Sequence, residues 1–139
     1  MNDEEQLRNL ASTFAHRIDS LDAELTSELF DERARLHPGS EMGGPIREGR
    51  HEIREYYEYV VSITKSMIHM TCNSVIDVNR IEATGKLYYL VLRISTDDQI
   101  TIVSGKYDDV YTKRTGVWRI AERFSTPLVP RVTLGRFPT

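Results

Sequence analysis

The fold is decided by a long stretch in the second half of the chain, residues 67–125, which reads MIHMTCNSVIDVNRIEATGKLYYLVLRISTDDQITIVSGKYDDVYTKRTGVWRIAERFS. It contains four segments rich in Val, Ile, Tyr and Thr, residues that favour β-strands. These segments cover residues 67–78, 83–95, 100–111 and 117–125. Short turn sequences, such as Thr96-Asp97-Asp98 and Arg114-Thr115-Gly116, separate them. The stretch therefore predicts an antiparallel meander of four long strands.

The first half of the chain has helical periodicity instead. Apolar residues recur every three or four positions over residues 4–18 and predict an amphipathic helix. Two further helices are predicted over residues 22–30 and 50–63, a short strand over 34–37, and a turn over 38–45. Three helices followed by four strands indicate the α+β class, with the helices packed on one face of a curved, mainly antiparallel sheet. That arrangement favours a cavity between the two layers, which is a natural ligand site.

Composition narrows the class of protein. The chain has 139 residues, of which 40% are hydrophobic and 28% are charged, and this suits a single globular domain over residues 1–139. A net charge of −3 argues against a nucleic-acid partner. No apolar run is long enough to span a bilayer, and the acidic start at residues 1–6 is unlike a secretory signal. We therefore expect a cytoplasmic protein with no membrane partner.

Metal ligands are scarce in the sequence. Cys72 is the only cysteine, which excludes an internal disulfide and a cysteine-rich zinc site. Three of the four histidines, His16, His37 and His51, lie in polar or loop settings with no acid or histidine at metal-ligand spacing, so we expect them at the surface. We expect no metal and no organic cofactor, because the sequence also lacks the common nucleotide-binding and hydrolase motifs.

The fourth histidine, His69, lies inside a predicted strand with apolar neighbours. Strand alternation places it on one mixed polar and apolar face, as in a pocket lining. Asp19 ends the apolar stripe of the first helix and is a candidate partner, because a carboxylate can orient a histidine as a general base. Two other interpretations stay open. His69 can be a buried structural histidine, and Asp19 or Asp22 can simply cap the second helix.

Two groups further along the chain are weaker candidates. Tyr107, Asp109 and Tyr111 share one strand face, where they either hydrogen-bond a substrate or pair across the sheet. Strand alternation puts Arg123 on the same face as Arg119. Arg123 either lines the pocket or lies at the surface, and we expect it at the surface.

Four phrases in this order resemble the SnoaL-like and scytalone dehydratase-like branch of the nuclear transport factor 2-like superfamily. They are FAHRIDSLD (14–22), GRHEI (49–53), IHMTCN with ATGK (68–73 and 83–86), and GKYDDVY running into GVWRI (105–111 and 116–120). The likeness extends from about residue 4 to residue 126. It is more specific for the fold than for an activity.

The resemblance implies a cone-shaped α+β barrel whose helices and curved sheet enclose a pocket. It also implies that Asp19 and His69 form a catalytic dyad, because they fall at the family's dyad positions. The residues that we expect to bind substrate are Phe14, Tyr57, Met67, Tyr89, Tyr107 and Arg123. This sequence departs from the scytalone dehydratases, since Ile18 replaces a tyrosine and residues 85–94 contain no second pocket histidine. It departs from the bile-acid dehydratase because Phe14 replaces a tyrosine.

These observations predict a cofactor-independent lyase of the dehydratase type, or an isomerase, that acts on a small hydrophobic or polycyclic molecule by proton abstraction. Tyr107, Tyr89 or Arg123 would polarise a carbonyl or a leaving group. The alternatives are a polyketide-cyclase-like enzyme and a non-catalytic module that binds a small ligand. The resemblance further implies a homodimer or homotrimer.

The C-terminal segment, residues 127–139, is predicted to form an extended strap. It contains no acid, three prolines and several apolar residues. Prolines disfavour a helix or a central strand. We expect Leu134 or Phe137 to be covered, either by the mouth of the chain's own pocket or by a neighbouring subunit.

Overall fold

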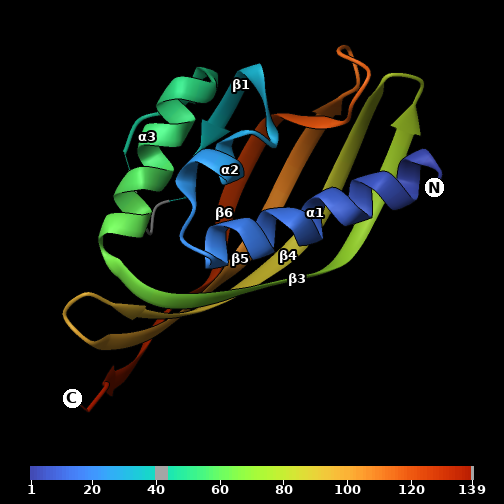
Figure 1. The fold of residues 1–139 in the computed structure, drawn as a ribbon. Helices are drawn as coiled ribbons and strands as arrows, with labels where there is room; N and C mark the ends of the chain where they lie inside the picture. The colour runs from blue at the N-terminus through green and yellow to red at the C-terminus, as the bar shows by residue number, and fades with distance from the viewer. Residues whose placement is uncertain (40–43, 139) are drawn as a thin grey trace.

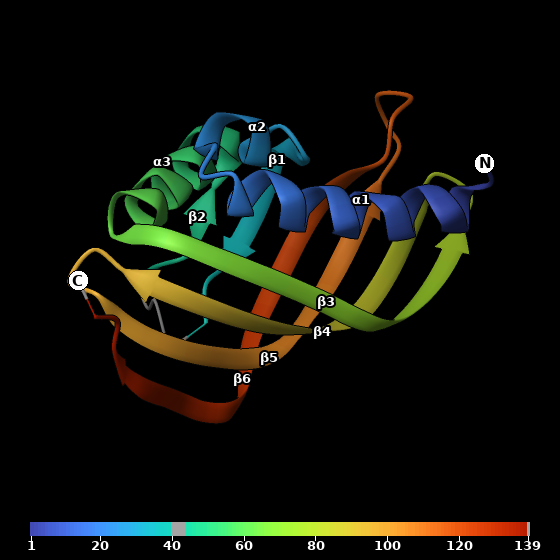
Figure 2. The same ribbon diagram turned by 60° about the horizontal axis from the view of Figure 1, so that its bottom comes forward.

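The computed structural model describes residues 1–39 and 44–138, and it has the predicted α+β architecture. The elements in chain order are α1 (Asp3–Asp19), α2 (Ala23–Ser27), β1 (Phe30–His37), β2 (Arg47–Glu48), α3 (Gly49–Ser62), β3 (Thr64–Asn79), β4 (Glu82–Ser95), β5 (Gln99–Thr112) and β6 (Arg119–Arg136). The strands form one sheet in the order β2-β1-β6-β5-β4-β3. The sheet is strongly bent, and the three helices lie on its concave face (Figures 1 and 2).

The predicted first helix is confirmed, and its ends follow from the sequence. Asn2 and Glu5 form a reciprocal capping box at the start of α1. Its apolar stripe is buried against the sheet. The helix ends at Asp19 just before Leu21, which has a positive φ of 61° and turns the chain toward α2. The carboxylate that ends α1 therefore lies beside the sheet.

The second predicted helix is shorter than expected. The Asp22 side chain caps α2 as one interpretation proposed, with the Leu25 backbone N–H as its donor. However, Phe30 belongs to β1, where it pairs in parallel with Ile120 of β6. Pairing between strands thus overrides the helical pattern at the end of this segment. The predicted turn at 38–45 falls largely on residues 40–43, which lie outside the described residues.

The four predicted strands are confirmed as the antiparallel meander β3 to β6. Each of the three turns contains a residue with positive φ, namely Arg80 at 62°, Asp98 at 68° and Gly116 at 92°. The expected barrel is not closed, because β2 and β3 stand at opposite ends of the strand order in the described parts of the chain. The helices, not further strand pairing, cover the open concave face.

The C-terminal segment is extended, but it is a continuation of β6 and not a separate strap. It pairs with β5 as far as the Gln99–Arg136 pair, although Pro127 and Pro130 lie within it. The prolines are tolerated because the pairing of β1 with β6 ends at Phe124, so the later residues form an edge where a missing N–H costs little.

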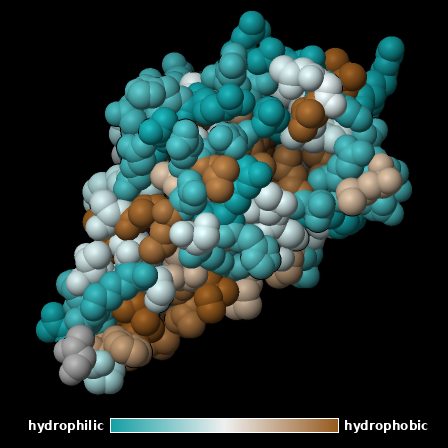
Figure 3. Space-filling model, in the orientation of Figure 1, coloured by the Kyte–Doolittle hydropathy of each residue, from teal (hydrophilic) through white to brown (hydrophobic). Residues whose placement is uncertain are grey.

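Of the two expected alternatives, burial of Leu134 or Phe137 at the mouth of the chain's own pocket is not seen. Leu134 is 56% exposed and Phe137 is 48% exposed. In Figure 3 apolar side chains gather at the end of the molecule where the C-terminus lies. Coverage by a second subunit stays a prediction. A long apolar edge of this kind favours association with another chain.

If a second copy covers this edge, replacing Leu134 and Phe137 with serine should lower the molar mass in solution from a dimer or trimer to a monomer. The backbone pairing is kept in this variant, whereas deletion of residues 130–139 removes it as well, and we expect the same loss of assembly from the deletion. Light scattering coupled to size exclusion measures the change. Replacement of the exposed Val117 on the opposite hairpin is the matched control. An unchanged mass in both tail variants would contradict the prediction.

Candidate active site

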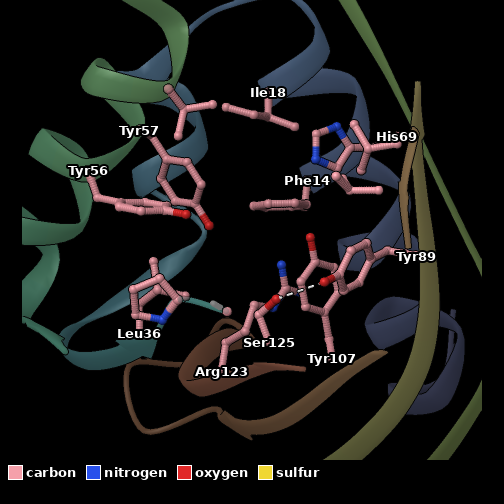
Figure 4. A pocket seen from close by; sticks show the side chains of 15 residues that line it. Phe14, Ile18, Leu36, Tyr56, Tyr57, His69, Tyr89, Tyr107, Arg123 and Ser125 are labelled. Carbon is pink, nitrogen blue, oxygen red and sulfur yellow. Dashed lines mark hydrogen bonds between the residues drawn. The ribbon is translucent and has the colours of Figure 1, made fainter. Parts of the chain in front are cut away.

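A cavity of about 100 Å³ lies between the helices and the concave face of the sheet. Its walls are made mainly of aromatic and aliphatic side chains, and His69 and Arg123 face each other across it (Figure 4). The lining residues are Phe14, Ile18, Leu36, Pro38, Gly39, Tyr56, Tyr57, Val60, His69, Tyr89, Val91, Val103, Tyr107, Arg123 and Ser125. The cavity is therefore apolar for the most part, with a small number of polar groups that converge on it.

The carboxylate of Asp19 holds His69 at two points. Its Oδ1 lies 2.8 Å from the His69 ring nitrogen Nδ1, and its Oδ2 accepts a hydrogen bond of 2.8 Å from the His69 backbone N–H. The two side chains are 22% and 10% exposed, respectively. The predicted contact between Asp19 and His69 is thus present, although the two residues lie 50 positions apart in the sequence. The Asp19 side chain contacts His69 and does not cap α2, which Asp22 does.

This contact decides which nitrogen of His69 is available. A carboxylate accepts hydrogen bonds, so Nδ1 carries the proton that it donates to Asp19. In the neutral ring Nε2 is then unprotonated and can accept a proton. The ring packs edge-on against Phe14, with 6.0 Å between the centroids, and it lines the cavity. The dyad therefore presents an oriented base to a mainly apolar space.

A second charged pair lies across the cavity from the dyad. The Arg123 guanidinium donates from Nε and Nη2 to the two carboxylate oxygens of Asp109, at 2.8 Å each. The Tyr111 hydroxyl donates to the same carboxylate at 2.9 Å. The expectation that Arg123 lies at the surface is wrong, since it is only 1% exposed.

A β-bulge explains the error. Val110 pairs with Glu122 while Tyr111 pairs with Ile120, so Ala121 is an extra residue in β6. The extra residue shifts the alternation of the strand. Arg123 consequently points inward, whereas Arg119 hydrogen-bonds the Glu28 carbonyl at the surface.

The guanidinium of Arg123 remains charged in this buried place. Burial alone would lower the pKa of Arg123, but the adjacent Asp109 carboxylate outweighs it and raises the pKa above its usual value. The guanidinium carbon lies 3.9 Å from the centre of the Tyr107 ring and 4.4 Å from that of Phe14. Its Nη1 is the one buried side-chain nitrogen or oxygen without a hydrogen-bond partner among the residues described.

Two glycines make room for the tyrosines on this side. A Cβ at Gly85 would lie 2.8 Å from the Tyr111 ring. A Cβ at Gly105 would lie 2.5 Å from the Tyr89 hydroxyl and 2.2 Å from the Thr126 carbonyl oxygen. Both contacts are far closer than real side chains allow, so the glycines are needed where they stand.

The structure brings together most of the residues that the sequence indicated for substrate binding. Phe14, Tyr57, Tyr89, Tyr107 and Arg123 all line the cavity with His69. Met67 is buried on the same face of β3 but is not among the lining residues, so its expected contact with substrate is not supported by its position.

Sequence reasoning missed Tyr56 and Ser125 as lining residues. Tyr56 belongs to the apolar stripe of α3, so its helical periodicity indicated burial but not the cavity. The Ser125 hydroxyl donates to that of Tyr89 at 3.2 Å. Ser125 follows the bulge of β6, and nothing in the sequence marks it.

One of the histidines expected at the surface is half-buried. His37 Nε2 lies 2.6 Å from Glu122 Oε2, and its ring stacks on Phe124 at 3.9 Å. His16 and His51 are exposed as expected. In residues 1–39 and 44–138, no group of three or more histidines, cysteines or acids is arranged to hold a metal ion.

The family model of SnoaL-like domains matches residues 1–124, which is most of the sequence. The chain belongs to the SnoaL-like domain family. No curated protein matches it. The resemblance seen in the sequence is thus confirmed at the level of the family.

Solved structures share the fold of this SnoaL-like domain. A Novosphingobium aromaticivorans protein provisionally named an aromatic ring hydroxylase is 20% identical, with a TM-score of 0.86 over 94% of this chain and 92% of that chain. A second protein from that organism, provisionally named a scytalone dehydratase, is 19% identical, with a TM-score of 0.84 over 99% and 89% of the two chains. A type 2 hexachlorocyclohexane dehydrochlorinase is 18% identical, with a TM-score of 0.76 over 91% and 88%. Within the described residues of the SnoaL-like domain, no helix is long and apolar enough to cross a bilayer.

The tyrosines around the cavity make a prediction about alkaline stability. Burial raises the pKa of Tyr56 to about 12 and raises those of Tyr57, Tyr107 and Tyr111 above the usual value of 10. Above pH 10 the unfolded chain therefore loses tyrosine protons that the folded chain keeps. Stability should be complete below pH 10 and should fall as pH rises, by about 1.4 kcal/mol per pH unit for each such tyrosine.

Urea unfolding between pH 8 and about 12 measures this loss. When the folded protein is titrated, tyrosine absorbance should show that the buried tyrosines ionise only at the upper end of that pH range or when the protein unfolds. A free energy of unfolding that stays level across the range would contradict the burial of these hydroxyls.

Proposed function

We propose that this SnoaL-like domain is a cofactor-independent lyase or isomerase that removes a proton from carbon in a small molecule bound in the cavity. His69 Nε2 is the general base and Asp19 orients it. The single observation that carries this proposal is the two-point contact of the Asp19 carboxylate with the ring and backbone of His69. That contact fixes the tautomer in which Nε2 is free to accept a proton.

The environment of the dyad suits this role. Asp19 stabilises the imidazolium that forms when His69 takes up a proton, because the carboxylate stays within hydrogen-bond distance of Nδ1. The mainly apolar walls lower the local dielectric constant, which strengthens electrostatic interactions inside the cavity. Removal of a proton from carbon also leaves negative charge on the substrate, and that charge needs stabilisation.

Arg123 is placed to supply that stabilisation. It is a permanent cation at the opposite side of the cavity, and both it and His69 pack on the ring of Phe14. Asp109 and Tyr111 hold it in place before the reaction begins, so little reorganisation is needed when charge develops. The negative charge then departs with a leaving group, which is elimination, or returns to carbon with a proton, which is isomerisation.

Family membership supports a reaction of this kind, and so do neighbours in fold whose names state a dehydratase and a dehydrochlorinase. The finer assignment to a dehydratase, a cyclase or an isomerase depends on the substrate. A module that only binds a ligand is the competing function, and it needs no oriented base.

Uptake of deuterium from D2O into small cyclic carbonyl compounds tests the proposal. The protein should catalyse exchange at an acidic C–H position, and His69→Ala should lower the rate by about 10²- to 10⁴-fold, as expected for loss of a general base. His51→Ala is the matched control, because His51 is exposed on α3. Equal exchange by the wild type and His69→Ala, or unfolding of His69→Ala with no exchange by the wild type, would indicate a structural histidine.

A further inference from the structure

The side of the cavity opposite His69 has more hydrogen-bond donors than acceptors. Arg123 Nη1 is buried and unpartnered, although the rest of the guanidinium is paired with Asp109. Within the part of the chain that the structure describes, the hydroxyls of Tyr57 and Tyr107 also make no hydrogen bond. Figure 4 shows both hydroxyls and the end of the guanidinium directed toward the middle of the cavity.

These groups cluster around one aromatic ring. The Phe14 ring centroid lies 5.8 Å from that of Tyr57, 6.2 Å from that of Tyr107 and 4.4 Å from the Arg123 guanidinium carbon. The three side chains that carry the donors therefore lie around one ring, and their polar ends point toward the same part of the cavity (Figure 4). Leaving a buried donor such as Arg123 Nη1 unpaired is costly, and the two hydroxyls face the same space, so this volume is suited to a ligand that brings acceptors.

The number of donors indicates the kind of acceptor. Nη1 of an arginine carries two hydrogens that can be donated, and each tyrosine hydroxyl carries one. The site therefore has four donor hydrogens that need an acceptor. A neutral carbonyl oxygen has two lone pairs, whereas an ionised carboxylate offers about four lone-pair positions. A carboxylate also forms the stronger, charge-assisted hydrogen bonds with a guanidinium. The burial that keeps the Tyr57 and Tyr107 hydroxyls protonated keeps them as donors.

The size of the cavity limits the rest of the ligand. A cavity of about 150 Å³ holds one benzene ring, and this one has about 100 Å³ with an opening to solvent. A single ring is therefore the most that fits inside it. The polycyclic substrates expected from the sequence exceed this volume.

We infer that the ligand of this cavity is a one-ring carboxylate, held by Arg123 Nη1 and the hydroxyls of Tyr57 and Tyr107 with its ring against Phe14. As a statement about substrate, this inference rests on the proposed function. In that role, the carboxylate end fixes the ring so that a C–H bond faces His69.

Isothermal titration calorimetry with three probes tests the inference. Benzoate has the predicted ring and charge, benzamide has the same shape without the charge, and 2-naphthoate has the charge with a second ring. We expect benzoate to bind at least about tenfold more tightly than benzamide, and 2-naphthoate to bind at least about tenfold more weakly than benzoate. Benzamide binding as tightly as benzoate would overturn the charge assignment, and 2-naphthoate binding equally well would overturn the size limit.

Variants then locate the carboxylate. Tyr57→Phe and Tyr107→Phe keep the rings but remove the donors, and each should weaken benzoate binding by about 3- to 10-fold while changing benzamide binding less. Tyr59→Phe is the matched control, because Tyr59 is exposed on α3. Arg123→Gln combined with Asp109→Asn removes the cation without leaving a buried charge unpaired, and it should abolish the preference for benzoate. If neither tyrosine variant changes the affinity for benzoate, the inference fails even if the double variant does not fold.

Failure of the ligand assignment can be distinguished from failure of the proposed reaction. His69→Ala leaves the donors intact, so it should keep the preference for benzoate over benzamide while losing deuterium exchange. Benzoate preference without any exchange would contradict the reaction and support the ligand class. Exchange on neutral ketones without benzoate preference would support the reaction and overturn the ligand class.

Discussion

Replacement of Asp19 by asparagine should lower turnover by about 10²- to 10⁴-fold while leaving the fold intact. The amide keeps the shape of the carboxylate, but its NH2 group can donate to Nδ1 and so favours the tautomer in which Nε2 carries the proton. His69 then faces the cavity with the wrong nitrogen. Deuterium exchange from D2O measures the loss, and circular dichroism measures the fold.

Asp22→Asn is the matched control for this prediction. Asp22 caps α2 through its side chain, and asparagine is an equally good N-cap, so that variant should keep both fold and rate. An Asp19→Asn protein that exchanges deuterium at the wild-type rate would show that the contact with His69 is structural.

The second large effect concerns stability. Arg123→Met alone should lower the free energy of unfolding by about 3–5 kcal/mol, because it leaves the fully buried Asp109 carboxylate with no cation. The double variant Arg123→Met and Asp109→Leu removes both charges and should recover much of this loss. Urea unfolding of the two single variants and the double variant forms the cycle that measures the coupling.

An exposed pair provides the comparison. Arg54 and Glu58 on α3 lie 2.8 Å apart with both side chains about half exposed, and Arg54→Met should change stability little. A small effect of Arg123→Met, similar to that of Arg54→Met, would show that Asp109 is protonated or solvated without its partner.

The Asp19–His69 dyad could be predicted because one residue follows from a helical pattern and the other from a strand pattern. The helical stripe of α1 ends at Asp19, and strand alternation turns His69 of β3 inward, so local pattern and family resemblance agree. Neither periodicity fixes a distance between residues 50 positions apart. The two-point contact through the His69 backbone N–H was therefore seen only in the structure.

The opposite side of the site could not be predicted in this way. A single extra residue at Ala121 reverses the alternation of β6, and the sequence contains no mark of the bulge. Arg123 was therefore placed beside Arg119, and its pairing with Asp109 was missed. The prolines of the C-terminal segment misled for a related reason, since their effect depends on whether β6 has one neighbouring strand there or two.

The central claim is that the dyad presents an unprotonated Nε2 of His69 to the cavity. Nitrogen-15 NMR of the imidazole measures this most directly, because the two ring nitrogens of a neutral histidine differ in chemical shift according to which one carries the proton. We predict that neutral His69 is protonated at Nδ1 in the wild type and that Asp19→Asn shifts the proton toward Nε2. Neutral His69 that carries its proton on Nε2 in the wild type would contradict the account.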